Sequence, residues 1–219
     1  RRDPKTGISD IYVIDIARGA SSRLTSDPAD VNVAVWSPDG SRIVWASNRG
    51  GSYQLYQKLA SGAGQEELLL ESSNRIIAID WSADGRYVIY TQIDPKTKAD
   101  VWILPLEGDR KPFPFLQTSS NEGLGVFSPD GGWVAYQSDE SGSNEVYVQT
   151  FPASGGKWPV STKGGLFPQW RRDGKELLYI SGERKMMAVE VKTGGTFEPG
   201  IPKAAFRSEE RRVGKECRS

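Results

Sequence analysis

The sequence predicts an all-β protein built as a β-propeller, and three observations carry that prediction. A five-residue turn motif occurs four times, in steps of 43 to 46 residues: WSPDG at 36–40, WSADG at 81–85, FSPDG at 127–131 and WRRDG at 170–174. A short apolar run follows each copy, and helical periodicity is absent throughout. Four short strands in each repeat of about 40 to 45 residues are the pattern of a propeller blade.

The turn motif itself is explained by its Asp-Gly pair. Pro38 and Pro129 preset φ at the first corner of the turn, and Asp is tolerated at the second corner. The glycine that follows accepts the positive φ that closes a hairpin. Each copy therefore predicts a tight connection between two antiparallel strands of one blade.

Two families of apolar segments are predicted as the central strands of the blades. Members of the first family follow the turns directly: RIVWAS, RYVIYT, WVAYQS and ELLYIS. Members of the second share an aliphatic-aromatic core: DIYVIDI at 10–16, YQLYQKL at 53–59, DVWILPL at 100–106, EVYVQTF at 145–151 and MMAVEV at 186–191. Weaker strands, such as VNVAVW at 31–36 and EELLLES at 66–72, complete the sets of four.

The residue pattern of these repeats resembles that of a known family. The order W-S-P-D-G, apolar strand, polar loop and I/V-Y resembles the TolB-like propeller repeats. Longer stretches are similar to the propeller that follows the kinase domain in some bacterial eukaryotic-like serine/threonine protein kinases: DRKPFPFLQT at 109–118, SPDGGWVAYQSDESG at 128–142 and WRRDGKELLYIS at 170–181. The resemblance covers residues 8–206 and implies a six-bladed ring. Four blades and the outer two strands of a fifth, at 10–26, are expected here, forming an incomplete arc.

Residues 207–219, RSEERRVGKECRS, break abruptly with this pattern and hold the only cysteine, Cys217. Their reverse translation resembles the read-through of a common short-read sequencing adapter. We therefore divide the chain into a propeller fragment at 1–206 and a non-native tail at 207–219. The start at Arg1, in mid-pattern, also suggests a fragment. An arc leaves faces uncovered that a ring would bury, so the chain is expected to be poorly soluble or to self-associate.

The composition argues against several classes of function. The formal net charge is +0 and no block of five like charges occurs, so nucleic acid is not an expected partner. No apolar run of about 18 residues is present, so no direct membrane insertion is expected. The sequence holds no histidine, which excludes Ser-His-Asp and Cys-His arrangements within it. Kinase signatures and Gly-x-Ser-x-Gly are also absent, so we expect no catalytic residues and no cofactor.

One segment, DESGSNE at 139–145, invites a calcium-site interpretation. Its Asp139, Ser141 and Ser143 offer oxygen atoms at alternate positions. Asn144 stands where a calcium-binding loop requires glycine, and no acidic residue occupies the twelfth position. We therefore predict a polar hairpin loop and no metal site.

The seven tryptophans are interpreted mainly as packing residues. Trp36, Trp81 and Trp170 occupy the blade position that Phe127 has in the third repeat, which is the behaviour of a core side chain. Trp158, in GGKWPVS, has no periodic counterpart. It is predicted to be the most exposed of the seven.

Loops on one face of the propeller are the predicted binding region. The loops that join the second strand to the third, and each blade to the next, share a face and include Asn48, Arg49, Asp139 and Glu140. Together with Trp158 these are the candidate partner-binding residues. The alternative is that the loops are only soluble turns.

The resemblance implies a non-catalytic module for protein interaction or ligand sensing, within a membrane-linked bacterial serine/threonine protein kinase whose catalytic part lies outside this sequence. Two alternatives stay open. One is the gating propeller of a prolyl-oligopeptidase-like serine peptidase, and the other is a free-standing periplasmic propeller of the TolB type. Because propellers host all three roles, the partner, the ligand and the compartment, periplasmic or cytoplasmic, stay open at this point.

Overall fold

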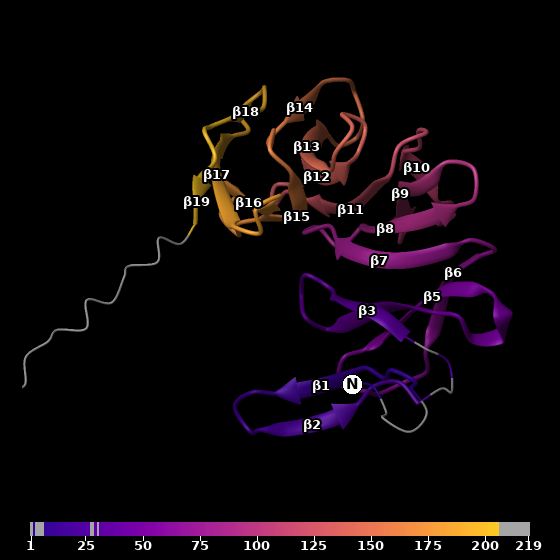
Figure 1. The fold of residues 1–219 in the computed structure, drawn as a ribbon. Coiled ribbons are helices and arrows are strands. Elements are labelled where there is room, and N and C mark those ends of the chain that lie inside the picture. Colours follow the sequence, from indigo (N-terminus) through magenta and orange to yellow (C-terminus); the bar gives the residue numbers. More distant parts are fainter. Residues whose placement is uncertain (1, 3–6, 27–28, 30, 206–219) are drawn as a thin grey trace, which may run out of the picture.

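A computed structural model describes residues 2, 7–26, 29 and 31–205. Within them, four antiparallel sheets follow one another along the chain as blades 1 to 4 and form an open arc (Figure 1). A two-stranded sheet, β1 (Tyr12–Asp15) and β2 (Ala20–Arg23), precedes blade 1. The predicted tail at 207–219 lies outside the described residues, and the division at residue 206 stays a prediction.

Blades 1 and 2 each contain four strands in sequence order. Blade 1 consists of β3 (Val31–Trp36), β4 (Arg42–Ser47), β5 (Tyr53–Leu59) and β6 (Glu67–Ser72), with the short 3₁₀ helix η1 (Arg49–Gly51) between β4 and β5. Blade 2 consists of β7 (Arg75–Trp81), β8 (Tyr87–Asp94), β9 (Lys98–Pro105) and β10 (Phe113–Leu116).

Blades 3 and 4 repeat this order, with a divided fourth strand at the end. Blade 3 consists of β11 (Glu122–Phe127), β12 (Trp133–Ser138), β13 (Glu145–Thr150) and β14 (Lys157–Pro159). Blade 4 consists of β15 (Gly165–Trp170), β16 (Glu176–Ser181), β17 (Met186–Lys192), β18 (Glu198–Pro199) and β19 (Lys203–Ala204), of which β18 and β19 both pair with β17. The predicted all-β propeller arc of four blades and two further strands is confirmed.

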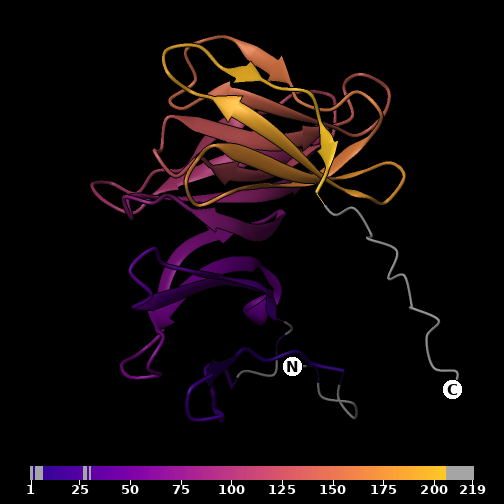
Figure 2. The ribbon, with the colours of Figure 1, turned by 90° about the vertical axis from the view of Figure 1, so that its left-hand side faces the viewer.

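The first strand of each blade lies on the concave side of the arc and the fourth on the outside (Figure 1). Viewed from the side, the blades follow one another with their sheets face to face (Figure 2). Because each sheet is antiparallel, its connections alternate between two faces of the propeller. We call "turn face" the face with the repeated Asp-Gly turns, and "loop face" the face with the connections from second to third strand and from blade to blade.

The repeated turn has the predicted geometry. Gly40, Gly85, Gly131 and Gly174 have φ values of 71°, 78°, 72° and 69°, in the left-handed region that favours glycine. In the first copy, the Gly40 N–H donates to the Ser37 carbonyl at 2.9 Å, and the Ser37 and Ser41 side chains donate to Asp39. These hydrogen bonds lower the pKa of Asp39 to about 2. The turn is thus held by its own side chains.

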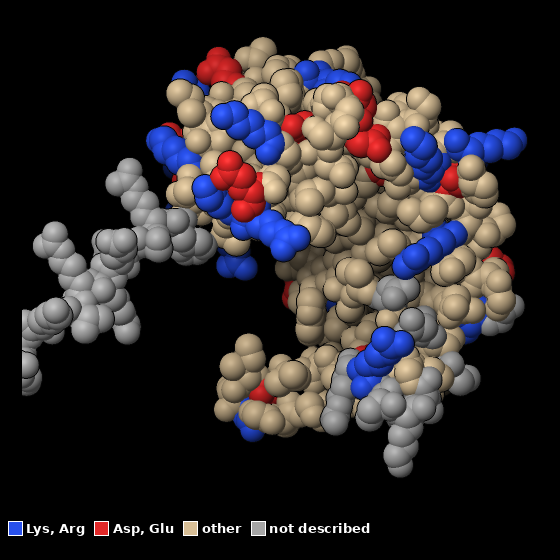
Figure 3. Space-filling model, viewed as in Figure 1, with Lys and Arg blue, Asp and Glu red and all other residues tan. Residues whose placement is uncertain are grey.

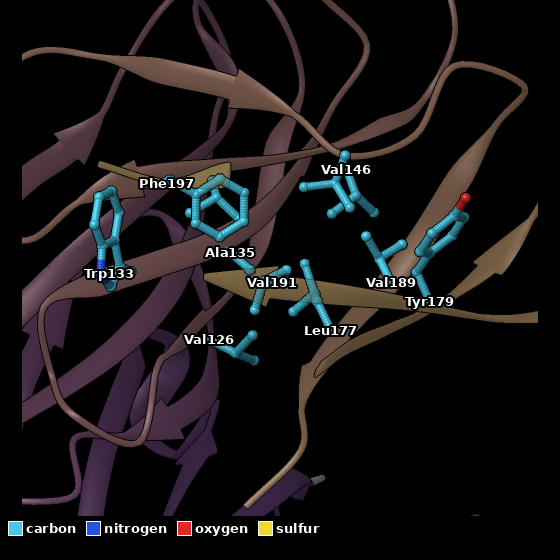
Figure 4. Packing of buried hydrophobic residues seen from close by; sticks show 11 residues of the cluster. Val126, Trp133, Ala135, Val146, Leu177, Tyr179, Val189, Val191 and Phe197 are labelled. Atoms are coloured by element: carbon cyan, nitrogen blue, oxygen red, sulfur yellow. The ribbon is translucent and has the colours of Figure 1, made fainter. Parts of the chain in front are cut away.

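Apolar side chains between neighbouring blades form the core. One cluster joins blades 1 and 2 around Leu55, Ile76 and Tyr90, and a second joins blades 2 and 3 around Ile103 and Phe127. A third joins blades 3 and 4, and Figure 4 shows part of it, with Trp133, Phe197 and Leu177. Each blade therefore depends on its neighbours for burial of its apolar faces, as in other repeat architectures.

Trp36 corrects the predicted burial of the inner-strand tryptophans. Trp81 and Phe127 are buried, and Trp170 is partly buried, but Trp36 is 49% exposed. At this position the ring packs toward the preceding blade, as Trp81 does in the cluster between blades 1 and 2. Only the two strands β1 and β2 precede blade 1 in the described structure, and they do not cover Trp36.

Both ends of the arc expose apolar side chains. At one end Trp36 is 49% exposed, and at the other Met186, whose neighbour Met187 packs against the cluster between blades 3 and 4, is 40% exposed. The opening between these ends is visible in Figure 3. Self-association through such faces stays a prediction.

Candidate functional site

The loop face is held together by contacts between its two kinds of connection. Asn121, from the β10–β11 connection, donates its backbone N–H and its side-chain amide to Asp139, in the β12–β13 connection, at 2.8 and 2.6 Å. Asn74 makes the corresponding side-chain bond to Asp94 at 3.0 Å. The two kinds of connection therefore lie together, as the sequence predicted.

Arg49 is fixed within blade 1. Its guanidinium lies 2.6 Å from a Glu66 carboxylate oxygen and 3.8 Å from the centre of the Tyr56 ring. Stacking and ion pairing together hold a cation in one orientation at low entropic cost. The Arg49 side chain is 24% exposed, and its Nε and Nη2 atoms are buried, so these contacts mainly fix the loop to blade 1.

The two acidic candidates of blade 3 are likewise oriented by neighbours. The hydrogen bonds from Asn121 lower the pKa of Asp139, so this carboxylate is ionised at neutral pH. Glu140 accepts from the Lys157 ammonium at 2.6 Å, and that ammonium lies 5.4 Å from the centre of the Tyr147 ring. Asn48 is the remaining candidate of this face, and its side chain is exposed just before η1.

Trp158 corrects the prediction that it is the most exposed tryptophan. Its ring is partly buried in β14 and packs edge-on against Trp133, with centroids 5.4 Å apart, and against Phe197 at 6.0 Å. The lack of a periodic counterpart reflects a local aromatic cluster rather than exposure. Among the described tryptophans the most exposed is Trp36.

The carboxylates of the segment at 139–145 accept hydrogen bonds from neighbouring protein groups. Glu145 accepts hydrogen bonds from the Ser161 hydroxyl and from the Gly164 N–H, the latter at 2.9 Å. Across residues 2, 7–26, 29 and 31–205, no three acidic, histidine or cysteine side chains are grouped so that they could hold a metal ion. Over the same residues, no helix is long and apolar enough to cross a bilayer.

Three carboxyl groups between blades 2 and 3, of which Asp80 is partly buried and the other two are fully buried, were not predicted. Asp80, on β7, accepts from the Phe127 N–H of β11 at 2.9 Å, and burial raises its pKa to about 6. Asp100 and Glu122 are fully buried, and burial also raises the pKa of both. Aligning the repeats would have marked Glu122 as unusual, because it stands at the position that the apolar Ile76 has in blade 2.

Burial raises the pKa of all three carboxyl groups, but they lack the neighbours of a catalytic site. Asp100 accepts from Thr97 and Gln117, and Glu122 accepts from Thr118. No basic residue of the described chain lies within 4 Å of either carboxylate, and the sequence has no histidine. They make the junction between blades 2 and 3 polar inside an otherwise apolar scaffold.

The fold is a β-propeller scaffold with polar connections on its loop face. Residues 3–121 match the family model of the TolB β-propeller domain, PD40. The chain therefore belongs to the TolB β-propeller domain family.

The chain is similar to proteins of several kinds. Over 105 residues the chain is 28% identical to tricorn protease homolog 1 of Streptomyces coelicolor, covering 47% of this chain and 10% of that protein. It is also similar to the crystal structure of TolB from Acinetobacter baumannii, with a TM-score of 0.72, 16% identity, and coverage of 89% of this chain and 48% of TolB. A structure of prolyl endopeptidases has a TM-score of 0.58 at 13% identity, covering 89% of this chain and 33% of that one. The chain thus spans about half of TolB and a smaller part of the two peptidases.

Proposed function

We propose that the chain is a non-catalytic interaction module that binds a partner through its loop face. The observation that carries the proposal is the fixed orientation of the acidic groups there: Asp139 accepts from Asn121, and Glu140 accepts from Lys157. Groups that are already ordered lose little conformational entropy on binding. A rigid scaffold with polar loops is a common arrangement for recognition.

The proposed partner is a protein surface or a small polar ligand. Lysine, arginine, aspartate and glutamate side chains are interspersed over the view in Figure 3, without a broad field of one sign. A nucleic-acid partner would favour a clustered basic surface, because phosphate contacts supply most of its affinity. Mixed charges instead favour a partner with a complementary pattern of both signs.

For the parent protein we propose a membrane-linked bacterial serine/threonine protein kinase. The support is the resemblance of 109–118, 128–142 and 170–181 to the propeller that follows such kinase domains. A second candidate is the gating propeller of a serine peptidase, which the similarities to tricorn protease homolog 1 and to prolyl endopeptidases favour. A free-standing propeller like TolB is the third.

The binding proposal is tested with two variants of equal charge change. The first carries Asn48→Lys and Glu140→Lys on the loop face, and the control carries Ser61→Lys and Glu107→Lys on the turn face. Affinity capture from the native bacterium should recover a protein with the wild type and the control, and lose it with the loop-face variant. Equal recovery by all three would rule out this face as the binding surface.

The parent is tested by sequencing the source DNA across both ends of the reading frame. A kinase domain upstream supports the signalling proposal. A hydrolase domain with Gly-x-Ser-x-Gly downstream would replace it with the peptidase candidate, and an upstream secretory leader alone would favour the free-standing propeller.

A further inference from the structure

A stacked aromatic pair recurs in blades 1, 2 and 3. Directly opposite residues of the second and third strands form it, and the ring centroids lie 5.8 to 6.5 Å apart with interplanar angles of 23 to 27°. The pairs are Trp45 with Tyr56, Tyr90 with Trp102, and Tyr136 with Tyr147. Offset stacking of this kind stabilises a pair of rings beyond the effect of their burial.

Blade 4 lacks the second member of the pair. Tyr179 of β16 is opposite Met187 of β17, so a flexible thioether stands where the other blades have an aromatic ring. Tyr179 lies at the edge of the cluster between blades 3 and 4, with its hydroxyl directed away from the other labelled side chains (Figure 4). The ring position over Tyr179 is therefore not filled by a second aromatic side chain.

A cavity of about 430 Å³ lies at this position. Its apolar wall is formed by Tyr179, Met187, Ile201 and Pro202. That volume is within the usual range of small-molecule sites, about 300 to 1,000 Å³. The divided fourth strand contributes to the cavity, because Ile201 and Pro202 lie between β18 and β19.

The polar rim of the cavity carries two lysines and one carboxylate. The Lys185 ammonium lies 2.7 Å from Glu183, in the connection between β16 and β17. Lys163 comes from the connection between blades 3 and 4, and among the described residues no carboxylate lies within 4 Å of its ammonium. Lys163 is thus available to an anionic group above an apolar floor.

The other blades show how a cation and a ring combine here. Arg49 lies over the third-strand ring of blade 1 at 3.8 Å, and Lys157 lies over that of blade 3 at 5.4 Å. Lys185 reaches the cavity from the same connection that supplies Arg49 in blade 1. A ring placed in the cavity would meet cationic groups of the kind that the scaffold already stacks on its own aromatic residues.

We propose that the blade 4 cavity binds an aromatic carboxylate, with the ring over Tyr179 in place of the missing aromatic side chain and the carboxylate on Lys163. This inference rests on the proposed binding role of the loop face. It specifies the chemical class of one ligand that would bind in a cavity at the edge of that face. An aromatic side chain at the C-terminus of a peptide has this chemistry, and N-acetylphenylalanine is a suitable probe.

Titration followed by ¹H–¹⁵N correlation spectra tests the proposal. With about 0.3 kcal/mol for each heavy atom, the 15 atoms of N-acetylphenylalanine correspond to a Kd of roughly 0.5 mM. N-acetylalanine should bind at least tenfold more weakly because it lacks the ring, and N-acetylphenylalaninamide severalfold more weakly because it lacks the charge. Equal affinity for all three would refute recognition of an aromatic carboxylate.

Two substitutions test whether the ligand binds in this cavity. Met187→Tyr restores the pair of the other blades, so it should keep the fold and abolish binding, and retained binding would show that the ligand lies elsewhere. Lys163→Gln should reduce the affinity for the acid to that for the amide, whereas the control Lys111→Gln on the turn face should change neither affinity. If both lysine variants behave alike, the assignment of Lys163 is wrong.

A third substitution keeps the test independent of Met187→Tyr folding. Ile201 is 83% exposed, so Ile201→Asp should fold and should weaken binding of the acid by placing a like charge at the cavity edge. Unchanged binding by this variant would contradict the proposed site. If capture of a protein partner depends on Asn48 and Glu140 while N-acetylphenylalanine does not bind, this inference fails and the proposed function of the loop face stands.

Discussion

The junction between blades 2 and 3 and the junction between blades 3 and 4 share one backbone plan but differ in chemistry. The first contains Asp80, Asp100 and Glu122, whose pKa values burial raises. The second is filled by apolar and aromatic side chains, with Phe197 in contact with Trp133, Trp158 and Trp170. The repeat therefore specifies strand pairing, while the side chains of each junction set its stability and its pH response.

The loop connections at these junctions also differ. Asn121 and Asp139 join by side-chain hydrogen bonds above blades 2 and 3. Above blades 3 and 4, Gly164 and Gly182 approach so closely that a Cβ on Gly164 would lie 2.8 Å from the Gly182 Cα. One connection is thus held by polar side chains and the other by close backbone approach.

Removing the aromatic centre of the blade 3–4 junction should have the largest effect. Phe197 is 2% exposed, and Phe197→Ala would leave a cavity among three tryptophans. We expect a loss of about 3 to 5 kcal/mol in the free energy of unfolding, measured in urea. The control Phe113→Ala affects a 39% exposed ring on an outer strand and should cost much less. Similar losses for both variants would contradict the central role of Phe197.

Asp80→Asn should stabilise the blade 2–3 junction at pH 8. The folded-state pKa of Asp80 is raised from 3.8 to about 6, so its contribution to stability is fully present below about pH 4 and is lost as the pH rises through about 6. Asn keeps an acceptor for the Phe127 N–H without ionising, and the gain at pH 8 is up to about 3 kcal/mol. Urea unfolding of both proteins at pH 5 and pH 8 measures it. The control Asp109→Asn, at an exposed carboxylate, should leave the pH dependence of the unfolding free energy unchanged. If Asp80→Asn also leaves that pH dependence unchanged, other groups are responsible for it.

Gly164→Ala should destabilise the close connection between blades 3 and 4. Both Gly164 and Gly62 have positive φ, 84° and 80°, but a Cβ on Gly62 would meet no atom within 4 Å. Gly62→Ala therefore measures the backbone cost alone, about 1 kcal/mol, and Gly164→Ala should cost about 2 kcal/mol because the contact with Gly182 adds to it. Thermal unfolding compares the two, and equal shifts in Tm would show that the contact relaxes without cost.

Asn121→Ala should have the smallest effect. It removes the side-chain hydrogen bond to Asp139 and leaves the backbone one, so we expect a loss of about 1 kcal/mol in the free energy of unfolding. Asn48→Ala, at an exposed side chain of the same face, is the control and should be neutral. A neutral Asn121→Ala would mean that the backbone bond alone holds the connection.

Strand positions were predictable because turn residues and apolar runs act locally. The segments at 31–36 and 53–59 are strands with the predicted bounds, and the Asp-Gly turns have the expected positive φ. Side-chain exposure was less predictable, because it depends on what lies against a blade. For that reason Trp36, predicted to be buried, is exposed, and Trp158, predicted to be exposed, is partly buried.

The period of the blade, its four strands, its glycine turns and the loops that share a face follow from the amino-acid sequence, since each depends on residues close in the chain. Which partners those residues have depends on how the chain packs. The pairing of Arg49 with Glu66, the burial of Glu122 between blades and the cavity beside Met187 depend on distant segments meeting across strands and junctions. Neighbouring blades set the local dielectric and the free volume, and these in turn set the pKa values and the binding sites that a sequence pattern does not reveal.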